Sequence, residues 1–294
     1  MISVLIPSFN FDVVPLVNNL QEQALSGSIP IEVIVWDDAS LSDFSFLNKR
    51  ENISFFRSSV NKGRAATREL LAKKAIYPYL LFLDADVFPT TDFFLSNYMK
   101  HLSEEIIIVG GIKYESKKPE KQRFFRWYYG KAREEISHEN RGKKPYNHFM
   151  TGNFLVPKSI FLRFSLNDVP PGYGHEDTLL GHKFQKYQIS ICHIDNPVYH
   201  LGLDENEIFL SKSKEAVCSL LYLKKLGYLL PTNLNAGFNW LEKFYLIKTF
   251  ALFFPLFNKQ AFKNYIYSGK LFSLLLFDIY KLAYYCHISL AKGK

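Results

Sequence analysis

Two aspartates one residue apart, Asp84 and Asp86, directly follow the apolar run Leu80-Leu81-Phe82-Leu83. Neighbouring carboxylates repel each other and resist burial unless a cation joins them. Hard carboxylate oxygens suit Mg²⁺ or Mn²⁺, which commonly complete their coordination with the phosphate oxygens of a substrate. The pair therefore predicts a divalent metal beside a phosphate-bearing ligand, although two aspartates that cap a loop would give the same short pattern.

A second acidic pair, Glu176 and Asp177, follows the glycine-rich turn Gly172-Tyr173-Gly174 and precedes an apolar segment. This order predicts carboxylates at the start of a helix, where acids stabilise the first turn. A carboxylate so placed can also act as a general base that accepts a proton from a bound ligand. Capping and base catalysis are compatible roles for these acids.

Apolar runs alternate with helical segments over the first hundred residues, which is typical of a parallel sheet covered by helices. The predicted strands are Ser3–Ile6, Glu32–Trp36, Ile53–Phe56, Tyr79–Leu83 and Ile106–Val109, with a later one at Ile189–Ile194. A helix is expected from Gly63 to about Ala75. The polar stretch Lys113–Tyr146 predicts either a mobile loop or a helix over a cleft.

Polar residues follow four consecutive predicted strands, at the edge where ligands bind in open α/β sheets. Five segments, in this order and spacing, resemble the motifs of family 2 glycosyltransferases with the GT-A fold: Val4–Asn10, Val35–Ser40, Asn61–Arg68, Leu83–Val87 and Gly172–Asp177. The resemblance covers about residues 1 to 202. It implies a Rossmann-like, mostly parallel sheet flanked by helices, a nucleotide-diphospho-sugar donor (a UDP-sugar), a divalent Mn²⁺ or Mg²⁺ cofactor, and transfer with inversion.

The resemblance also assigns residues to the donor. Pro7 and Asn10 would line the base pocket, and Asp38 would contact the uracil or ribose. Three residues would approach the nucleotide, namely Asn61, Gly63 and Arg64. Asp84 would hold the ribose or sugar. The family often has Asn after the arginine of the Gly63 helix, whereas Glu69 follows Arg68 here, so no role beyond a structural ion pair is carried over to Arg68.

Metal, base and acceptor residues follow from the same resemblance. Asp86 would bind the metal, and His200 falls where several GT-A enzymes supply a histidine to the metal or the diphosphate; a structural histidine is the alternative. Asp177 would be the catalytic base, and Glu176 would orient it or bind an acceptor hydroxyl. Gly152 and Asn153 would lie beside the sugar and the acceptor.

Three regions follow from this interpretation: a nucleotide-sugar-binding half at 1–110, an acceptor-binding and catalytic half at 111–223, and a basic aromatic helical tail at 224–294. The tail holds ten lysines, against Glu242 and Asp278 as its acids. If residues after Pro255 form one long amphipathic helix, Lys259, Lys263, Lys270 and Lys281 share one face. Asp278, Lys281 and His287 disfavour a membrane span, so we expect an interfacial helix on an anionic membrane.

Packing of that apolar face on the rest of the chain, or on a second copy in a homo-oligomer, is the alternative interpretation. Nucleic acid is disfavoured as a partner, because arginine is absent after Arg163 and the lysines accompany Leu and Phe.

The overall composition sets wider limits. The 294 residues are 48% hydrophobic and 22% charged, which excludes a disordered chain. Cys192, Cys218 and Cys286 match neither a disulfide framework nor a zinc spacing, and no signal-peptide core is present. We therefore expect a cytoplasmic protein, peripheral on the inner face of the membrane, that contributes to cell-surface polysaccharide synthesis.

A nucleotidyltransferase and a non-catalytic sugar-nucleotide-binding protein are the alternative functions. A nucleotidyltransferase usually has a Gly-rich basic loop after its first strand, whereas this chain has Ser8–Asp12 there.

Overall fold

The structure, a computed structural model, describes residues 1–164, 169 and 172–291. The chain divides into two compact units. The sheet unit comprises Met1–Glu115, Glu135–Asp168 and Glu176–Gly202. The helical unit comprises Ser116–Glu134, Val169–His175 and Leu203–Lys294. The last three residues of the predicted tail, two of them lysines, lie outside the described residues.

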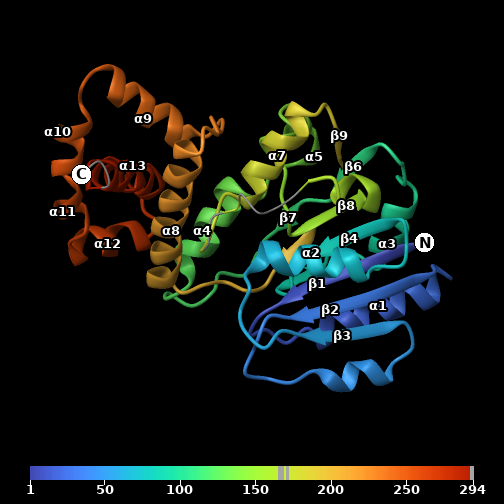
Figure 1. Ribbon diagram of the computed structural model, residues 1–294. Helices are drawn as coiled ribbons and strands as arrows, with labels where there is room; N and C mark the ends of the chain where they lie inside the picture. Colours follow the sequence, from blue (N-terminus) through green and yellow to red (C-terminus); the bar gives the residue numbers. More distant parts are fainter. Residues whose placement is uncertain (165–168, 170–171, 292–294) are drawn as a thin grey trace. The chain divides into compact units, whose positions relative to one another are not determined.

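A seven-stranded sheet forms the centre of the sheet unit, in the order β3-β2-β1-β4-β8-β6-β9 (Figure 1). Its strands are β1 (Ile2–Ser8), β2 (Ile31–Asp37), β3 (Ile53–Arg57), β4 (Tyr79–Leu83), β6 (Ile106–Val109), β8 (Asn153–Pro157) and β9 (Ser190–His193). β8 runs antiparallel to β4 and β6, and the other neighbouring pairs are parallel. The sheet is thus mostly parallel, in agreement with the sequence pattern.

Helices bury both faces of the central strand β1, which explains its almost unbroken apolar sequence. Ile2, Val4 and Ile6 pack in one core with buried side chains of α1 (Val14–Ser26) and α3 (Phe94–Met99). α2 (Arg64–Lys74) contacts β1 and β2 from the opposite face. The remaining helices of this unit are a 3-10 turn at Ser45–Lys49, α5 (His138–Gly142), α6 (Lys158–Phe161) and α7 (Glu176–Lys186).

The predicted strands of the sheet are present at nearly the expected bounds, and the helix after Gly63 is α2. β8 was not predicted, because its five residues run directly into α6 and a short apolar run does not distinguish a strand from a helix. Lys113–Tyr146 contains two helices, α4 (Phe124–Arg133) and α5, joined and flanked by loop segments.

A second, three-stranded sheet completes the sheet unit, in the order β5-β10-β7. It consists of β5 (Val87–Pro89), β10 (Val198–His200) and β7 (Ile112–Lys113). β10 pairs antiparallel with β5, so that His200 lies opposite Val87. This pairing brings residue 200 next to the chain that follows Asp86.

In the helical unit, α13 (Ser273–Ala291) is the central helix (Figure 1). Packed around it are α8 (Asn206–Lys225), α9 (Asn233–Lys243), α10 (Ile247–Leu252), α11 (Phe254–Phe257) and α12 (Gln260–Tyr267). Phe125 of α4 lies 6.0 Å from Phe209 of α8 and 5.2 Å from Phe277 of α13, measured between ring centroids. The C-terminal extension is therefore helical and has an aromatic core of its own, to which α4 contributes.

The condition for the lysine stripe, one long helix after Pro255, is not met. α11, α12 and α13 are separate, and between the last two Gly269 and Phe272 have positive φ values of 61° and 69°, which a right-handed helix cannot contain. Lysines 259, 263, 270 and 281 therefore do not form one stripe. Two of them pair with acids instead, at 3.6 Å from Glu207 and 2.9 Å from Asp278.

Among the described residues, α13 is the one helix long and apolar enough to cross a membrane, judged by length and composition alone. Its Asp278 is paired with Arg133 of α4 as well as with Lys281, and a third of its most apolar stretch is buried. The central helix of a soluble core meets the same criterion, so this finding is weak evidence for a span.

Candidate active site

The carboxyl-end edge of the sheet gathers the predicted site residues of the sheet unit. Asp38 follows β2 and Asp84 follows β4, while the antiparallel β8 starts at this same edge with Asn153 opposite Leu83. The Asp84 N–H donates a 3.2 Å hydrogen bond to the Gly152 carbonyl. A Cβ on residue 152 would come within 2.9 Å of Asp84 Oδ2, so the close approach requires glycine.

Arg68 links the two acidic pairs. Its Nη2 donates to Asp84 Oδ1 at 2.7 Å, and its Nη1 donates to Glu176 Oε1 at 3.1 Å. The Arg68 side chain is only 1% exposed. Burial alone would raise the pKa of Asp84, but Arg68, Arg64 and His200 together lower it below its ordinary value. The sequence indicated only a structural ion pair for Arg68, and in the structure this residue pairs with carboxylates from two distant segments.

Asp177 lies in the first turn of α7, as the sequence predicts, and is held by residue 151. The backbone N–H and the hydroxyl of Thr151 both donate to Asp177 Oδ1, at 3.3 Å and 2.6 Å. Burial and the adjacent Glu176 carboxylate raise the pKa of Asp177 to about 6, although Thr151 and Arg68 act in the opposite direction. A carboxylate with this pKa is ionised at neutral pH and is a better proton acceptor than an ordinary aspartate.

Asp86 and His200 form the candidate metal pair. His200 Nε2 lies 3.5 Å from Asp86 Oδ2, and the Leu201 N–H donates a 2.8 Å bond to the Asp86 carbonyl. A Cβ on Gly202 would come within 2.3 Å of Asp86 Oδ2, so this loop too passes close to the carboxylate. Burial raises the pKa of Asp86, His200 lowers it, and Asp84 raises it.

The Asp86 carboxylate and the His200 imidazole could supply part of the coordination shell of an octahedral divalent ion. Adjacent ligands of Mg²⁺ or Mn²⁺ at 2.0–2.1 Å are roughly 3 Å apart, close to the separation of Asp86 and His200. Over the described residues, no group of three or more His, Cys, Asp or Glu side chains could hold a metal. The remaining ligands would therefore have to come from water and substrate oxygens, as Mg²⁺ often requires.

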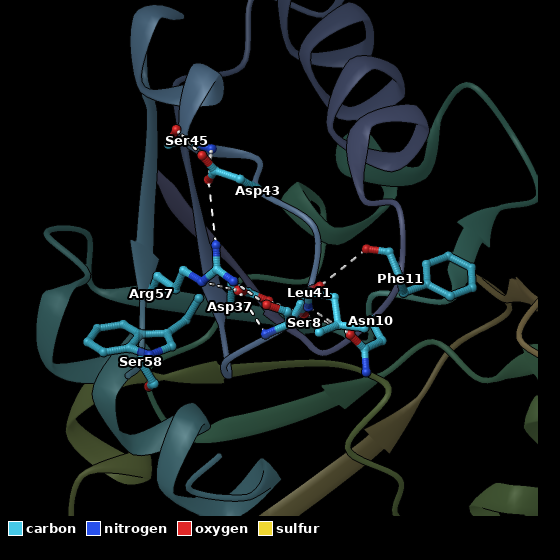
Figure 2. A network of polar contacts seen from close by, with 11 residues as sticks. Ser8, Asn10, Phe11, Asp37, Leu41, Asp43, Ser45, Arg57 and Ser58 are labelled. Carbon is cyan, nitrogen blue, oxygen red and sulfur yellow. Dashed lines mark hydrogen bonds and ion pairs between the residues drawn. The ribbon is translucent and has the colours of Figure 1, made fainter. Parts of the chain in front are cut away.

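The segments after β1 and β2 form a linked turn (Figure 2). Asn10, with a φ of 51°, donates its N–H to Ser40 Oγ at 2.6 Å and accepts a bond from the Leu41 N–H at 3.1 Å. Ser40 is bound to the fully buried Asp37, and Arg57 of β3 pairs with Asp37 at 3.2 Å. Neither Asp37 nor Arg57 was predicted as a site residue, because no motif joins positions twenty residues apart.

Asp38 shapes the turn that starts α2. Its two carboxylate oxygens accept bonds from the Lys62 and Gly63 N–H groups at 2.9 Å and 2.8 Å. Asn61 Oδ1 also accepts from the Gly63 N–H at 3.1 Å, and Gly63 has a φ of 85°. Arg64 follows, and its charge lowers the pKa of both Asp84 and Asp86. Pro7 lies in β1, opposite Trp36 of β2.

The assignment of Asn153 to acceptor binding does not fit its surroundings. The residue is 0% exposed. Its Oδ1 accepts from the Tyr98 hydroxyl at 2.6 Å, and its Nδ2 donates to the carbonyls of Gly111 and Asn196 at 2.8 Å and 3.0 Å. Because both amide atoms are engaged, the Asn153 side chain is a structural link between strands and loops.

Comparison with known proteins identifies a family. The model of the family described as "Glycosyl transferase family 2" matches residues 3–164, more than half of the chain. No curated protein matches the chain.

Solved structures show the fold. Glucosyl-3-phosphoglycerate synthase from Mycobacterium tuberculosis is 16% identical with a TM-score of 0.52, covering 79% of this chain and 81% of that chain. Mannosyltransferase PcManGT from Pyrobaculum calidifontis is 12% identical with a TM-score of 0.51, covering 99% of this chain and 75% of that one. TarS 1-349 from S. aureus is 16% identical with a TM-score of 0.49, covering 100% and 92%. The similarity to the synthase and the mannosyltransferase confirms the predicted GT-A fold.

Proposed function

The chain belongs to glycosyl transferase family 2, and from this premise we propose that it transfers a sugar from a nucleotide-diphospho-sugar to an acceptor hydroxyl with inversion. The acceptor oxygen attacks the anomeric carbon and forms the new C–O bond. The bond between that carbon and the diphosphate oxygen breaks, and the nucleotide diphosphate leaves with both electrons. The hydroxyl proton passes to a base of the enzyme.

Asp177 is the base in this proposal, and its environment is the single observation that carries it. The carboxylate accepts two bonds from Thr151, lies beside the Arg68–Glu176 ion pair, and has a pKa raised to about 6. It is thus fixed in place, ionised at neutral pH and able to take a proton. Glu176, paired with Arg68, orients this end of the loop.

The donor diphosphate is proposed to bind near Asp84, Asp86 and His200, where a divalent metal would be held by Asp86 and His200. When bound, such an ion neutralises charge that develops on the leaving diphosphate. The proposal draws support from the two structures that share the fold. The mycobacterial synthase was solved with UDP and Mn²⁺ or Mg²⁺, and the mannosyltransferase with GDP-Man and Mn²⁺.

We further propose a UDP-sugar as the donor and a glycan or lipid-linked hydroxyl as the acceptor, at the cytoplasmic face of a membrane. In the helical unit, the excess of lysine over acid among residues 224–291 supports a location near anionic lipid. Membership of the family removes the nucleotidyltransferase alternative. Only a measurement of transferase activity distinguishes the proposed enzyme from a non-catalytic sugar-nucleotide-binding protein.

The test combines donor turnover with stereochemistry. Purified protein is incubated with UDP- and GDP-sugars, Mn²⁺ and candidate glycan or polyprenyl acceptors, and the anomeric configuration of the product is read by NMR. Inversion is expected, and Asp177→Asn should reduce transfer by about 10² to 10⁴ without weakening donor binding. A product with retained configuration, or full activity of Asp177→Asn, would contradict the assignment of Asp177 as base.

A further inference from the structure

The helical unit exposes a run of large apolar side chains between the end of α9 and α11. We call this surface the aromatic edge, and it consists of Trp240, Phe244, Tyr245, Leu252, Phe253 and Leu256. Figure 1 shows α10 and α11 on the side of α13 away from α8. The six side chains of the aromatic edge are 44% to 92% exposed, so they are open to solvent. Contiguous exposed apolar patches on proteins commonly mark surfaces that contact another protein or a membrane.

Tyr245 is the most exposed of these side chains, at 92%, and it occupies the turn between α9 and α10. Its φ is 59°, in the left-handed region where glycine and asparagine are usual and a bulky residue is strained. At this exposure the Tyr245 side chain contributes little to packing. The strain and the exposure together indicate that this side chain serves contact with something outside the chain.

Lysines lie among the aromatic residues. Lys243, Lys248 and Lys259 are exposed, whereas Glu242 is the one acid between residues 240 and 260. Glu242 is itself 3.5 Å from Lys224. Trp240 and Phe244 lie 4.9 Å apart between ring centroids, so the aromatic groups cluster beside this positive charge. Protein surfaces that enter the headgroup layer of a membrane are typically rich in Trp, Tyr and lysine.

A second copy of the chain is a poorer match to this surface. In a symmetric dimer the same patch meets itself, which would place the lysines of one copy against those of the other. Anionic lipid headgroups supply the opposite charge, and their acyl boundary accepts aromatic side chains. Charge complementarity therefore favours an anionic membrane over a second copy of the chain as the partner of the aromatic edge.

We propose that the aromatic edge inserts into the interface of an anionic bilayer, with Tyr245 at its tip and Lys243, Lys248 and Lys259 on the headgroups. This inference rests on the proposed membrane location and assigns it to specific residues. It replaces the lysine stripe on one long helix, which the fold does not contain.

Trp240 offers a site-specific probe of the full-length protein. It is 56% exposed, whereas the other two tryptophans, Trp36 and Trp127, are buried. Vesicles of phosphatidylcholine with phosphatidylglycerol should shift tryptophan emission to the blue, and brominated lipid should quench it. Vesicles of phosphatidylcholine alone should do neither at the same concentration.

Two variants test the residues. Tyr245→Asn should lower vesicle affinity by about threefold or more without loss of thermal stability, because asparagine tolerates a positive φ. K243E/K248E should lower affinity at least about tenfold, since each lysine contributes roughly a factor of five near an anionic surface. The matched controls are Leu25→Ser, an equally apolar position that is 81% exposed on α1, and K49E/K73E. Both should bind as wild type.

The proposal is overturned if the variants bind vesicles as tightly as wild type, because the membrane contact would then lie elsewhere. It is also overturned if the wild type ignores anionic vesicles but sediments as a dimer that Tyr245→Asn dissociates. Donor turnover with a soluble acceptor is measured on the same preparations. It should be unchanged in every variant, so failure of docking and failure of the proposed transferase activity are read separately.

Discussion

The Arg68 guanidinium pairs with two of the four carboxylates of the site. A buried guanidinium is costly unless it is paired with acids, and Asp84 and Glu176 pair with Nη2 and Nη1 of Arg68 from two different segments. The same bonds fix the end of β4 relative to the start of α7 through α2. One cation thus positions residues proposed to act on the donor and on the acceptor.

Arg68→Met tests this arrangement, because it keeps most of the side-chain volume and removes the charge. Two partly buried carboxylates would lose their partner, so we expect a loss of about 3–5 kcal/mol in the free energy of unfolding. Urea unfolding at pH 7.5 measures it. Arg64→Met, at the start of the same helix, is the control and should weaken donor binding with little effect on stability. Equal stability of Arg68→Met and wild type would refute the linking role.

The raised pKa of Asp177 predicts a pH dependence. A base acts in its ionised form, so kcat/KM should be constant above pH 7 and fall as pH drops through about 6. A plateau extending down to pH 4.5 would show that Asp177 does not limit the reaction.

The raised pKa of Asp177 also predicts how folding stability changes with pH, and this trend is opposite to that of activity. Because the folded protein raises the pKa of this group, its stabilising effect is complete below pH 3.8 and is lost as pH rises through about 6. Asp177→Asn should therefore melt no lower than wild type at pH 8. A marked drop in its melting temperature would assign Asp177 to structure in place of catalysis.

Sequence alone locates the acids of the site but not the contacts that fix them. Asp84, Asp86 and Asp177 are found because each follows a strand or a glycine-rich turn, where parallel sheets gather ligands. Arg57 and Asp37 are missed because their pairing depends on strand register, which no local motif encodes. Asn153 is misassigned because its short polar side chain suits either a ligand or a buried link, and only the fold decides.

The three-stranded sheet brings together Asp86 and His200, the proposed metal ligands. Antiparallel pairing of β5 with β10 places His200 beside Asp86, and the chain then turns at Gly202 against the Asp86 carboxylate. No sequence pattern indicated β7 or the pairing partner of β10, since two- and three-residue strands are too short for periodicity.

Gly202→Ala tests the importance of that turn. The new Cβ would lie 2.3 Å from Asp86 Oδ2 and 2.6 Å from Asp86 Cβ, so the carboxylate must move. We expect the apparent affinity for Mn²⁺ in donor binding to fall at least about tenfold, with the fold intact. Gly142→Ala on α5, where a Cβ meets nothing within 4 Å, is the control. An unchanged Mn²⁺ titration for Gly202→Ala would separate the loop from the metal.

The two units are built on different principles, one on a sheet and the other on an aromatic helical core. The helical unit joins residues 116–134 to the C-terminal helices, and α8 spans the boundary expected at residue 223. Composition marked the tail as basic and aromatic, but it could not show that α4 belongs to the same core. Some of its aromatic residues, such as Phe277 and Tyr280, lie in that core, whereas others are exposed, those of the aromatic edge among them.

Truncation after Gly237 should therefore damage the protein. It cuts α9 and removes α10 to α13, which leaves Phe125 and Phe209 without Phe277. We expect aggregation, or dye binding to exposed apolar surface, in place of a clean catalytic core. Phe277→Ala should show the same trend with a loss of about 3–5 kcal/mol, and the exposed Leu275→Ala should be neutral. A soluble, cooperatively melting truncated protein would argue against the shared core.

The central claim is that the strand-end acids bind a nucleotide diphosphate through a divalent ion. Calorimetric titration of UDP into the intact protein, with and without Mn²⁺, tests it most directly, with Asp86→Ala as the comparison. The wild type should bind UDP tightly only with Mn²⁺, and Asp86→Ala should lose that dependence together with most of the affinity. Metal-independent UDP binding by the wild type, or an unchanged Mn²⁺ response in Asp86→Ala, would contradict the account.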